Sequence, residues 1–195
     1  MTLPLIGLSG YGRVGKDAAA AAIVELGWHL GKFSQPMKDV AYAADPPIVQ
    51  NGITYSYARL VDAFGIERVK DDYPASRVFQ QRLGKAGRDV LGEDVWVNAA
   101  LARIPHDSTG AVFVDCRFPN EADAIRESGG IVLRIERPGY GPVAGPDGEV
   151  HISETALDDY AFDVVVENSS DLHTLRSTVR ALATAYLDAR LTRRR

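Results

Sequence analysis

Residues 10–17, Gly-Tyr-Gly-Arg-Val-Gly-Lys-Asp, constrain the fold of this 195-residue chain more than any other segment. They follow a short apolar run, Leu3–Leu8, and precede an alanine-rich stretch, Ala18–Leu26. The run predicts a buried strand, and the stretch predicts a helix that ends near Gly27. In a glycine-rich turn between strand and helix, the backbone N–H groups and the positive end of the helix point at one anion. The sequence therefore predicts a phosphate-binding loop, and an ordinary glycine turn is the alternative.

The residue types within this loop match the expected chemistry at every position but the last. Glycines let the backbone turn sharply and approach a ligand closely, and a lysine adds a positive charge for the outer phosphates of a nucleotide. The segment fits G-x-x-x-x-G-K-[ST] except at Asp17. The residues expected to bind the nucleotide are Gly10, Gly12, Arg13, Val14, Gly15, Lys16 and Asp17.

The remaining chain predicts an α/β fold. Apolar runs at 28–33, 111–115, 131–136 and 162–166 predict four further strands, with helical patterns between them. Strands that alternate with helices predict βαβ units, right-handed crossovers and a mainly parallel sheet. Residues 48–105 lack strong alternation and predict several short helices. This helical insertion either binds substrate or is a plain helical cap without a ligand. The sequence contains no linker that would divide the chain into two domains.

Local signals predict the later helices and one long loop. Pro119 suits the first turn of a helix that ends at Ser128. Residues 137–150 are rich in glycine and proline and predict a mobile loop. Residues 169–171, Ser-Ser-Asp, can cap the last helix. Its apolar stripe predicts core packing and consists of Leu172, Leu175, Val179, Leu182 and Tyr186.

Composition excludes several classes of function. The net charge is −4 and the pI is about 5.6, so charge gives no support for nucleic-acid binding. The basic residues 193–195 are expected to form a solvated tail. The single cysteine, Cys116, excludes an internal disulfide framework and a zinc site built from cysteines. No signal peptide or membrane-spanning segment is expected, which predicts a cytoplasmic protein without membrane or nucleic-acid partners.

Acidic residues near the expected edge of the sheet are candidate metal ligands. Ligands of parallel sheets bind beyond the carboxyl ends of the strands, which places the 10–17 loop, Ser34, Asp115 and Arg137 together. Asp115 either holds magnesium, directly or through water, or caps the helix that follows it. Asp17 offers magnesium a charged oxygen; alternatively it caps its own helix or orients an arginine.

Arginines are the other candidate ligands. The guanidinium group matches phosphate oxygens better than an ammonium group does. Arg117, two residues after Asp115, is the best single candidate, and Arg137, at the root of the 137–150 loop, is next. Closure of that loop would bring Arg137 onto a transferring phosphoryl group and exclude water. The arginines expected near the cleft are Arg82, Arg88, Arg117, Arg134 and Arg137.

Several short motifs occur in a fixed order along the chain and together indicate a known family. It resembles the deoxynucleoside monophosphate kinases of bacteriophages, within the P-loop kinase superfamily, and more distantly the animal-type phosphomevalonate kinase. Lys85-Ala86 departs from the pattern of these relatives. The resemblance depends on residues 10–17, Phe33-Ser34-Gln35-Pro36-Met37-Lys38, Gln81-Arg82-Leu83-Gly84, Gly87-Arg88, Asp94-Val95-Trp96-Val97, Asp115-Cys116-Arg117-Phe118-Pro119-Asn120-Glu121, His151-Ile152-Ser153-Glu154 and Asn168.

The resemblance implies an enzyme that moves the γ-phosphoryl group of ATP to a deoxynucleoside 5′-monophosphate with Mg²⁺. It implies one P-loop kinase domain over 1–195, built on a five-stranded parallel sheet flanked by helices. It also implies a substrate-binding region at about 38–100, a lid at about 137–154 and a homodimer. A phage-encoded chain of this kind would act in the cytoplasm of the host cell.

Residue roles carried over from the resemblance, together with the expected metal ligands, fall into three groups. Catalysis is assigned to Lys16, Arg117 and Arg137. Metal binding is assigned to Asp17 and Asp115 from their position in the sequence and not from the resemblance. The acceptor side comprises Lys38, Arg82, Arg88, Arg117, Glu121 and Glu154.

Two other functions remain open. The first is a P-loop kinase for another small acceptor, such as phosphomevalonate or dephospho-coenzyme A. The second is a regulatory module that binds a nucleotide without kinase activity. Low basicity disfavours a nucleic-acid module, and composition does not separate the two kinase alternatives.

Overall fold

A computed structural model describes residues 3–144 and 148–192, which form two compact units. The first unit contains the described parts of 1–33 and 101–195, and the second is Ser34–Ala100. The expected substrate-binding region at about 38–100 lies within the second unit. Residues 145–147 of the expected lid and the basic tail at 193–195 lie outside the described residues.

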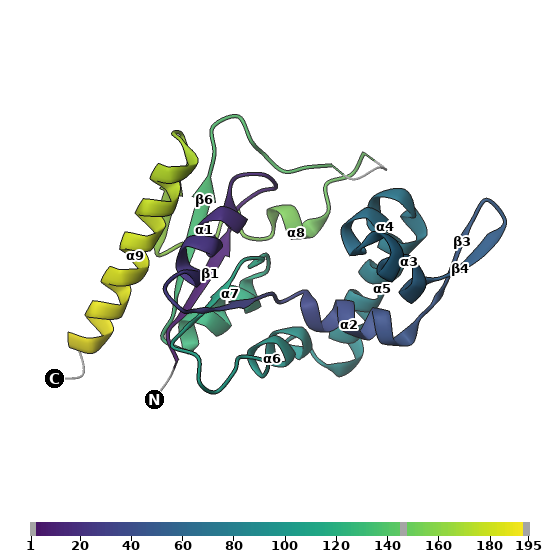
Figure 1. The fold of residues 1–195 in the computed structure, drawn as a ribbon, viewed down its shortest axis with the longest axis horizontal. Coiled ribbons are helices and arrows are strands. Elements are labelled where there is room, and N and C mark those ends of the chain that lie inside the picture. The colour runs from purple at the N-terminus through teal and green to yellow at the C-terminus, as the bar shows by residue number, and fades with distance from the viewer. Residues whose placement is uncertain (1–2, 145–147, 193–195) are drawn as a thin grey trace. The chain divides into compact units, whose positions relative to one another are not determined.

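The first unit contains a five-stranded parallel sheet, which confirms the predicted α/β class (Figure 1). Its strand order is β2-β5-β1-β6-β7, so β1 lies between β5 and β6. Every predicted strand is present, although most are shorter than expected. The bounds are β1 Leu5–Ser9, β2 His29–Gly31, β5 Ala111–Phe113, β6 Ile131–Glu136 and β7 Val164–Glu167.

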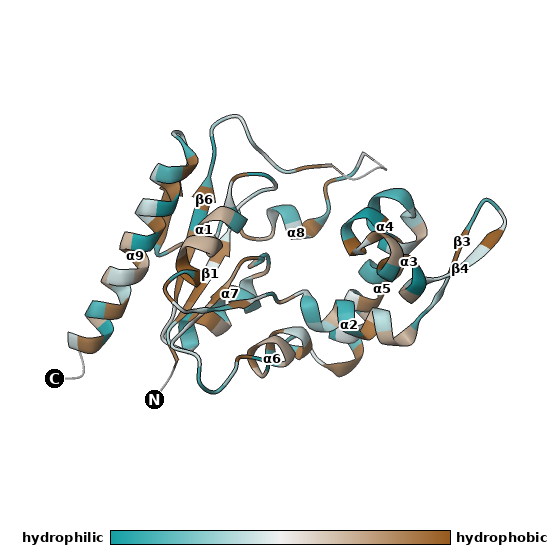
Figure 2. Ribbon diagram, in the orientation of Figure 1, coloured by the Kyte–Doolittle hydropathy of each residue, from teal (hydrophilic) through white to brown (hydrophobic). Residues whose placement is uncertain are grey.

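Helices cover both faces of this sheet. Helices α1 and α9 contact each other and bury a common core with Ile6 and Leu8 of β1. Gly7 points to the opposite face, because side chains alternate along a strand, and there it approaches Ile125 of α7. In Figure 2 the strands are mostly brown, as expected for strands buried on both faces. The helices of this unit are α1 Lys16–Val24, α7 Pro119–Glu127, α8 Ile152–Thr155 and α9 Leu172–Thr192.

Helix α9 confirms its predicted cap and corrects its predicted stripe. The Asp171 carboxylate accepts a hydrogen bond from the N–H of Thr174 at 2.7 Å. Leu175 and Val179 are buried, but Leu172 is 57% exposed. Leu172 is the first residue of the helix, and periodicity alone does not show where a helix leaves the core. No helix within residues 3–144 and 148–192 has the length and apolar character needed to cross a membrane.

The second unit is not purely helical, so the predicted helical insertion is wrong in part. An antiparallel hairpin, β3–β4, precedes α3, and α4 was also not expected. Asn51 and Gly52 form the hairpin turn with φ values of 52° and 75°. Ser34 precedes α2, but its side chain makes no capping hydrogen bond to that helix, contrary to the prediction. The elements are α2 Gln35–Ala44, β3 Pro47–Gln50, β4 Ile53–Ser56, α3 Tyr57–Phe64, α4 Ile66–Asp72, α5 Pro74–Leu91 and α6 Val95–Leu101.

The second unit has its own small core. Buried side chains from α2, the hairpin, α3 and α4 meet there, and partly buried aromatic residues surround them. Trp96 of α6 lies over α5, and its indole N–H donates to the carbonyl of Gly84 at 3.0 Å. The buried core residues are Ala41, Ile48, Tyr57, Leu60 and Val69.

Candidate phosphate-binding site

The glycine loop lies at the centre of the sheet, at the carboxyl end of β1. From β1 the chain passes to β2 on one side, and it later crosses from β5 to β6 on the other side. Open α/β sheets bind ligands at such a reversal of direction. The backbone of Gly10 has φ 134°, and a Cβ there would lie 2.2 Å from the carbonyl oxygen of Ile135. Only glycine therefore fits at this entry to the loop.

A second segment supports the loop from the far end of the chain. Asn168, directly after β7, donates from Nδ2 to the carbonyl of Val14 at 2.8 Å. A Cβ on Gly15 would lie 2.8 Å from Leu175 Cδ2 and 2.9 Å from Asn168 Nδ2. The turn between β7 and α9 therefore braces the loop and requires a glycine at position 15.

Lys16 bonds to carbonyl groups of its own loop. Its ammonium group donates to the carbonyl of Gly10 at 2.6 Å and to that of Tyr11 at 2.5 Å. Burial, and then the nearby charge of Arg117, lower the pKa of Lys16 to about 8. Both effects disfavour the positive charge in the free protein. A bound anion would reverse them, so the loop is electrostatically prepared for a polyphosphate.

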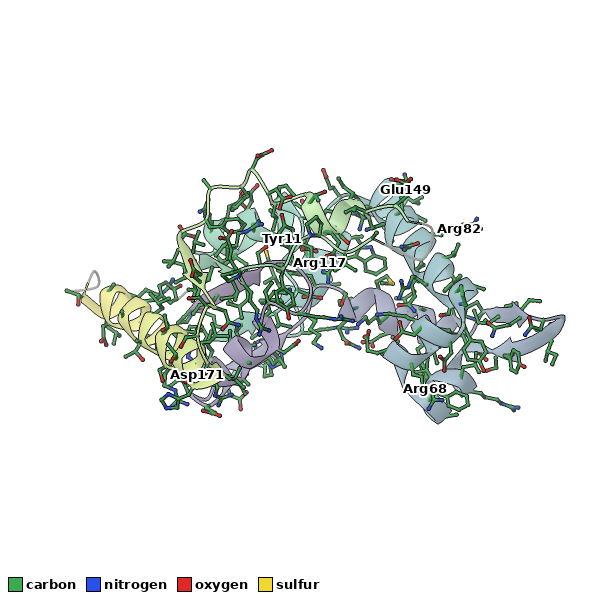
Figure 3. All side chains as sticks on the ribbon, turned by 90° about the horizontal axis from the view of Figure 1, so that it is seen from above. Tyr11, Arg68, Arg82, Arg117, Glu149 and Asp171 are labelled. Carbon is green, nitrogen blue, oxygen red and sulfur yellow. The ribbon has the colours of Figure 1, made fainter. Side chains whose placement is uncertain are left out.

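Arg117 and Glu154, two predicted acceptor-side residues, form an ion pair beside the loop. Arg117 Nη1 donates to Glu154 Oε1 at 2.6 Å and lies 3.4 Å from Ser153 Oγ. The Arg117 side chain is 41% exposed, whereas that of Glu154 is 14% exposed. Figure 3 labels Arg117 and Tyr11, which line the same small pocket. The structure thus brings together the loop, the segment after β5 and helix α8.

Glu121 acts on the backbone that carries Arg117. Its Oε2 atom accepts hydrogen bonds from the N–H groups of Arg117 at 2.7 Å and Phe118 at 3.0 Å. Burial raises the pKa of Glu121 to about 8, although these two N–H groups oppose the rise. A glutamate at the third position of a helix is a known capping signal, and this one fixes the start of α7. Its predicted contact with an acceptor remains a prediction.

The two predicted metal ligands have different surroundings. Asp115 Oδ1 accepts a hydrogen bond from the N–H of Phe33 at 2.8 Å, and Glu121 rather than Asp115 caps α7. Asp17 is exposed in the first turn of α1. Across the described ranges, no three His, Cys, Asp or Glu side chains gather as a metal cluster. Magnesium in nucleotide sites is held by one or two carboxylates together with phosphates and water, so this donor set fits it.

The segment after β6 forms the predicted loop and approaches the phosphate loop. Val143 Cγ2 would lie 3.5 Å from a Cβ added at Gly12. Arg137 is exposed, and its guanidinium carbon lies 4.7 Å from the ring centre of Tyr140. The loop is therefore present where the sequence placed it. The proposed swing of Arg137 onto a phosphoryl group remains a prediction.

The other predicted acceptor residues belong to the second unit. Lys38 pairs with Glu67 at 3.3 Å, and Glu67 also pairs with Lys70 at 3.2 Å. Arg82 and Arg88 both lie on α5, and Arg82 is exposed. Sequence reasoning missed Glu67 and Lys70 because it did not expect α4. The charged segment from Glu67 to Asp72 was the sequence signal that could have indicated these residues.

Comparison with known proteins supports the resemblance found in the sequence. No family model matches the chain. A protein of Acanthamoeba polyphaga mimivirus, named "Putative deoxynucleotide monophosphate kinase", is 27% identical over 203 residues, covering 90% of this chain and 93% of that protein. The resemblance to deoxynucleotide monophosphate kinases is therefore confirmed at modest identity.

Two solved structures illustrate the structural neighbours. A shikimate kinase from Aquifex aeolicus aligns with a TM-score of 0.44 and 10% identity, covering 93% of this chain and 96% of that one. A dephospho-CoA kinase from Campylobacter jejuni aligns with a TM-score of 0.47 and 11% identity, covering 95% and 98%.

Proposed function

We propose that the protein transfers the γ-phosphoryl group of ATP to a deoxynucleoside 5′-monophosphate. The observation that carries this proposal is the position of Lys16, whose part-buried ammonium group donates to two loop carbonyls and lies near Arg117. This arrangement favours a highly charged anion such as a triphosphate. The name of the viral relative supports the choice of acceptor class.

Donor binding is assigned to the loop. Phosphoryl transfer depends mainly on positioning and on neutralising charge, with little covalent chemistry from the protein. The backbone N–H groups of 10–17 and the ammonium group of Lys16 would hold the outer phosphates. Mg²⁺, when bound, supplies positive charge between the phosphates, and Asp17 and Asp115 would hold it. An acceptor phosphate is already ionised at neutral pH, so the reaction needs no general base.

Arg117 is assigned to the acceptor phosphate. Glu154 holds the Arg117 side chain in place in the free protein through a charge-assisted hydrogen bond. An incoming phosphate would compete with Glu154 for the same guanidinium group. Arg137, on the loop after β6, is assigned to the closed state, in which water is excluded.

The remaining acceptor contacts and the oligomeric state follow from the resemblance. Lys38, Arg82, Arg88 and Glu121 stay candidates for binding the acceptor nucleotide. A homodimer is part of the same proposal.

A coupled assay of ADP release tests the proposed reaction. Each deoxynucleoside monophosphate is supplied with ATP and Mg²⁺, and phosphomevalonate and dephospho-coenzyme A serve as competing acceptors. We expect turnover with at least one deoxynucleoside monophosphate and none with the other two acceptors. Turnover with phosphomevalonate or dephospho-coenzyme A alone would overturn the acceptor class. ATP binding without turnover on any acceptor would identify a regulatory module instead.

A further inference from the structure

Arg134 is a buried arginine that the proposed reaction does not use. It lies on β6, opposite Ser9 of β1 in the sheet, and is 8% exposed. Its neighbours Leu133 and Ile135 point into the core shared with α1 and α9. Arginine is almost never this buried unless its charge is paired. The partners of Arg134 therefore indicate what it holds in place.

Three hydrogen bonds fix the guanidinium plane of Arg134. Its Nε donates to Glu136 Oε1 at 2.9 Å, and Nη2 donates to Asp158 Oδ1 at 3.1 Å. Nη1 donates to the carbonyl of Leu157 at 3.2 Å. Two of these partners belong to the turn that follows α8, the helix that carries Glu154. One side of Arg134 is thus bound to the turn at 157–158.

The guanidinium group of Arg134 also lies near two aromatic rings. Its carbon atom lies 5.0 Å from the ring centre of Tyr11 and 5.3 Å from that of Phe162. The hydroxyl of Tyr11 donates to the same Asp158 oxygen at 2.7 Å. Tyr11 is therefore held at its ring by a cation–π contact and at its hydroxyl by a carboxylate.

Tyr11 connects this cluster to the donor site. It is the second residue of the phosphate loop, and its carbonyl accepts a hydrogen bond from Lys16. A displacement of Tyr11 would move this carbonyl and the neighbouring carbonyl of Gly10. Lys16 would then lose the position from which it faces the donor phosphates.

Resting on the proposed function, we propose that Arg134 is a positioning residue for ATP. Arg134 and Asp158 clamp Tyr11 and keep the first half of the phosphate loop, with Lys16, in its binding conformation. Arg134 itself contacts no substrate in this role. The clamp also joins the donor loop to the turn after α8.

The size of the effect follows from the population of the binding conformation. The apparent dissociation constant of a ligand rises in inverse proportion to the fraction of protein that can bind it. If the loop without Arg134 occupies its binding conformation about one tenth of the time, ATP binds about tenfold more weakly.

The chain offers a matched control in Arg126 of α7. Its guanidinium carbon lies 4.8 Å from the ring centre of Tyr160, and Nε donates to Asp163 at 3.1 Å. Arg126 also donates to the carbonyl of Ala161. The residue types and contacts resemble those of Arg134, but these partners lie outside the phosphate loop. Substitution of Arg126 thus measures how much the loss of any stacked, ion-paired arginine changes the Kd for ATP.

The test compares Arg134→Met with Arg126→Met by calorimetric titration with ATP and Mg²⁺, without any acceptor. We expect Arg134→Met to raise the Kd for ATP about tenfold, and Arg126→Met to change it less than about twofold. Arg134→Lys keeps the charge but not the flat stacking surface, so only partial recovery is expected. An unchanged Kd in Arg134→Met, or an equal rise in both methionine variants, would overturn the proposal.

A second variant covers the case in which Arg134→Met does not fold, as judged by thermal melting. Tyr11→Ala removes the clamped ring but leaves Arg134 and its carboxylate partners in place. We expect the same rise in the Kd for ATP. Tyr11→Phe keeps the ring and should show a smaller rise. Wild-type affinity in Tyr11→Ala would contradict the clamp. ATP binding is measured directly and without an acceptor. Absence of acceptor turnover would therefore refute the proposed reaction but would not change the Kd values on which the role of Arg134 depends.

Discussion

Two lysines predicted to bind phosphate groups, Lys16 and Lys38, differ in their electrostatic surroundings. Lys16, in the first unit, donates to two backbone carbonyls and lies near the positive charge of Arg117. Lys38, in the second unit, pairs with the carboxylate of Glu67, which also pairs with Lys70. The carboxylates of Glu154, Asp17 and Asp115 stabilise the charge of Lys16, but burial and Arg117 outweigh them. The charge of Lys38 is partly neutralised by a direct ion pair.

The difference shows how each lysine can be used. Burial, and then the charge of Arg117, lower the pKa of Lys16, so a polyphosphate bound there would stabilise its ammonium form. At Lys38 an anion must displace a carboxylate whose side chain is 74% exposed. The Lys38 side chain is only 12% exposed, so its carboxylate partner is the accessible member of the pair and the one that an anion would replace. Lys16 is therefore suited to catalysis, and Lys38 to moderate, reversible binding.

The largest expected effect is on Lys16→Ala. We expect turnover to fall by at least ~10²-fold, because the variant removes a preorganised charge from the transition state. Lys38→Ala should mainly raise the acceptor KM. Steady-state kinetics of the two variants measure the contrast directly. A loss of only a few-fold in Lys16→Ala would mean that the loop does not hold the donor.

Arg117→Ala should have the next largest effect. Its charge-assisted contact with an acceptor phosphate is worth about 1.5–3 kcal/mol, so we expect acceptor kcat/KM to fall by about tenfold or more. The Kd for ATP should change little, as measured by titration. Unchanged acceptor KM and kcat would remove Arg117 from the site.

The pH dependence of ATP use should distinguish the two lysines further. Because the pKa of Lys16 is about 8, the ammonium form declines as pH rises through 8, and anion binding weakens with it. We expect kcat/KM for ATP to fall about tenfold between pH 7 and pH 9. Lys16→Arg should abolish this fall, since arginine stays charged. A profile in Lys16→Arg that matches wild type would assign the ionisation to another group.

The smallest expected effect is on Glu67→Gln. Removing the carboxylate frees Lys38 and Lys70 for an anion, so we expect the acceptor KM to decrease about two- to threefold. The melting temperature should change little, because Glu67 is largely exposed. Glu67→Ala serves as the control for side-chain volume. An increased acceptor KM in both variants would show that Glu67 itself binds the acceptor.

Much of the first unit was predictable, because its signals are local. The Gly10–Asp17 loop, the five strands and the start of α7 at Pro119 all follow from runs of apolar residues and from glycine or proline. In the second unit, the hairpin was missed although Asn51-Gly52 is a strong turn signal. Its strands are only four residues long, so alternation along them is too brief to recognise.

The contacts that shape the candidate site were less predictable. The hydrogen bond from Tyr11 to Asp158 joins residues 147 positions apart. No periodicity in the sequence indicates such a pair, and neither residue type is unusual in a loop. Glu121 was expected at the acceptor, yet its carboxylate bonds to the backbone of Arg117 and Phe118. A capping position at the start of a helix gives that role a local signal.

The brace between Asn168 and Val14 has a consequence for synthesis of the protein. Chains emerge from the ribosome N-terminus first, and folding often begins before they are complete. The strand, the loop and α1 are therefore made long before Asn168 and Leu175, which close around Gly15. A nascent chain that stops short of Asn168 contains every residue of the loop and still lacks its support. Nucleotide capture should thus appear only after Asn168 and Leu175 have been made and have packed against the loop.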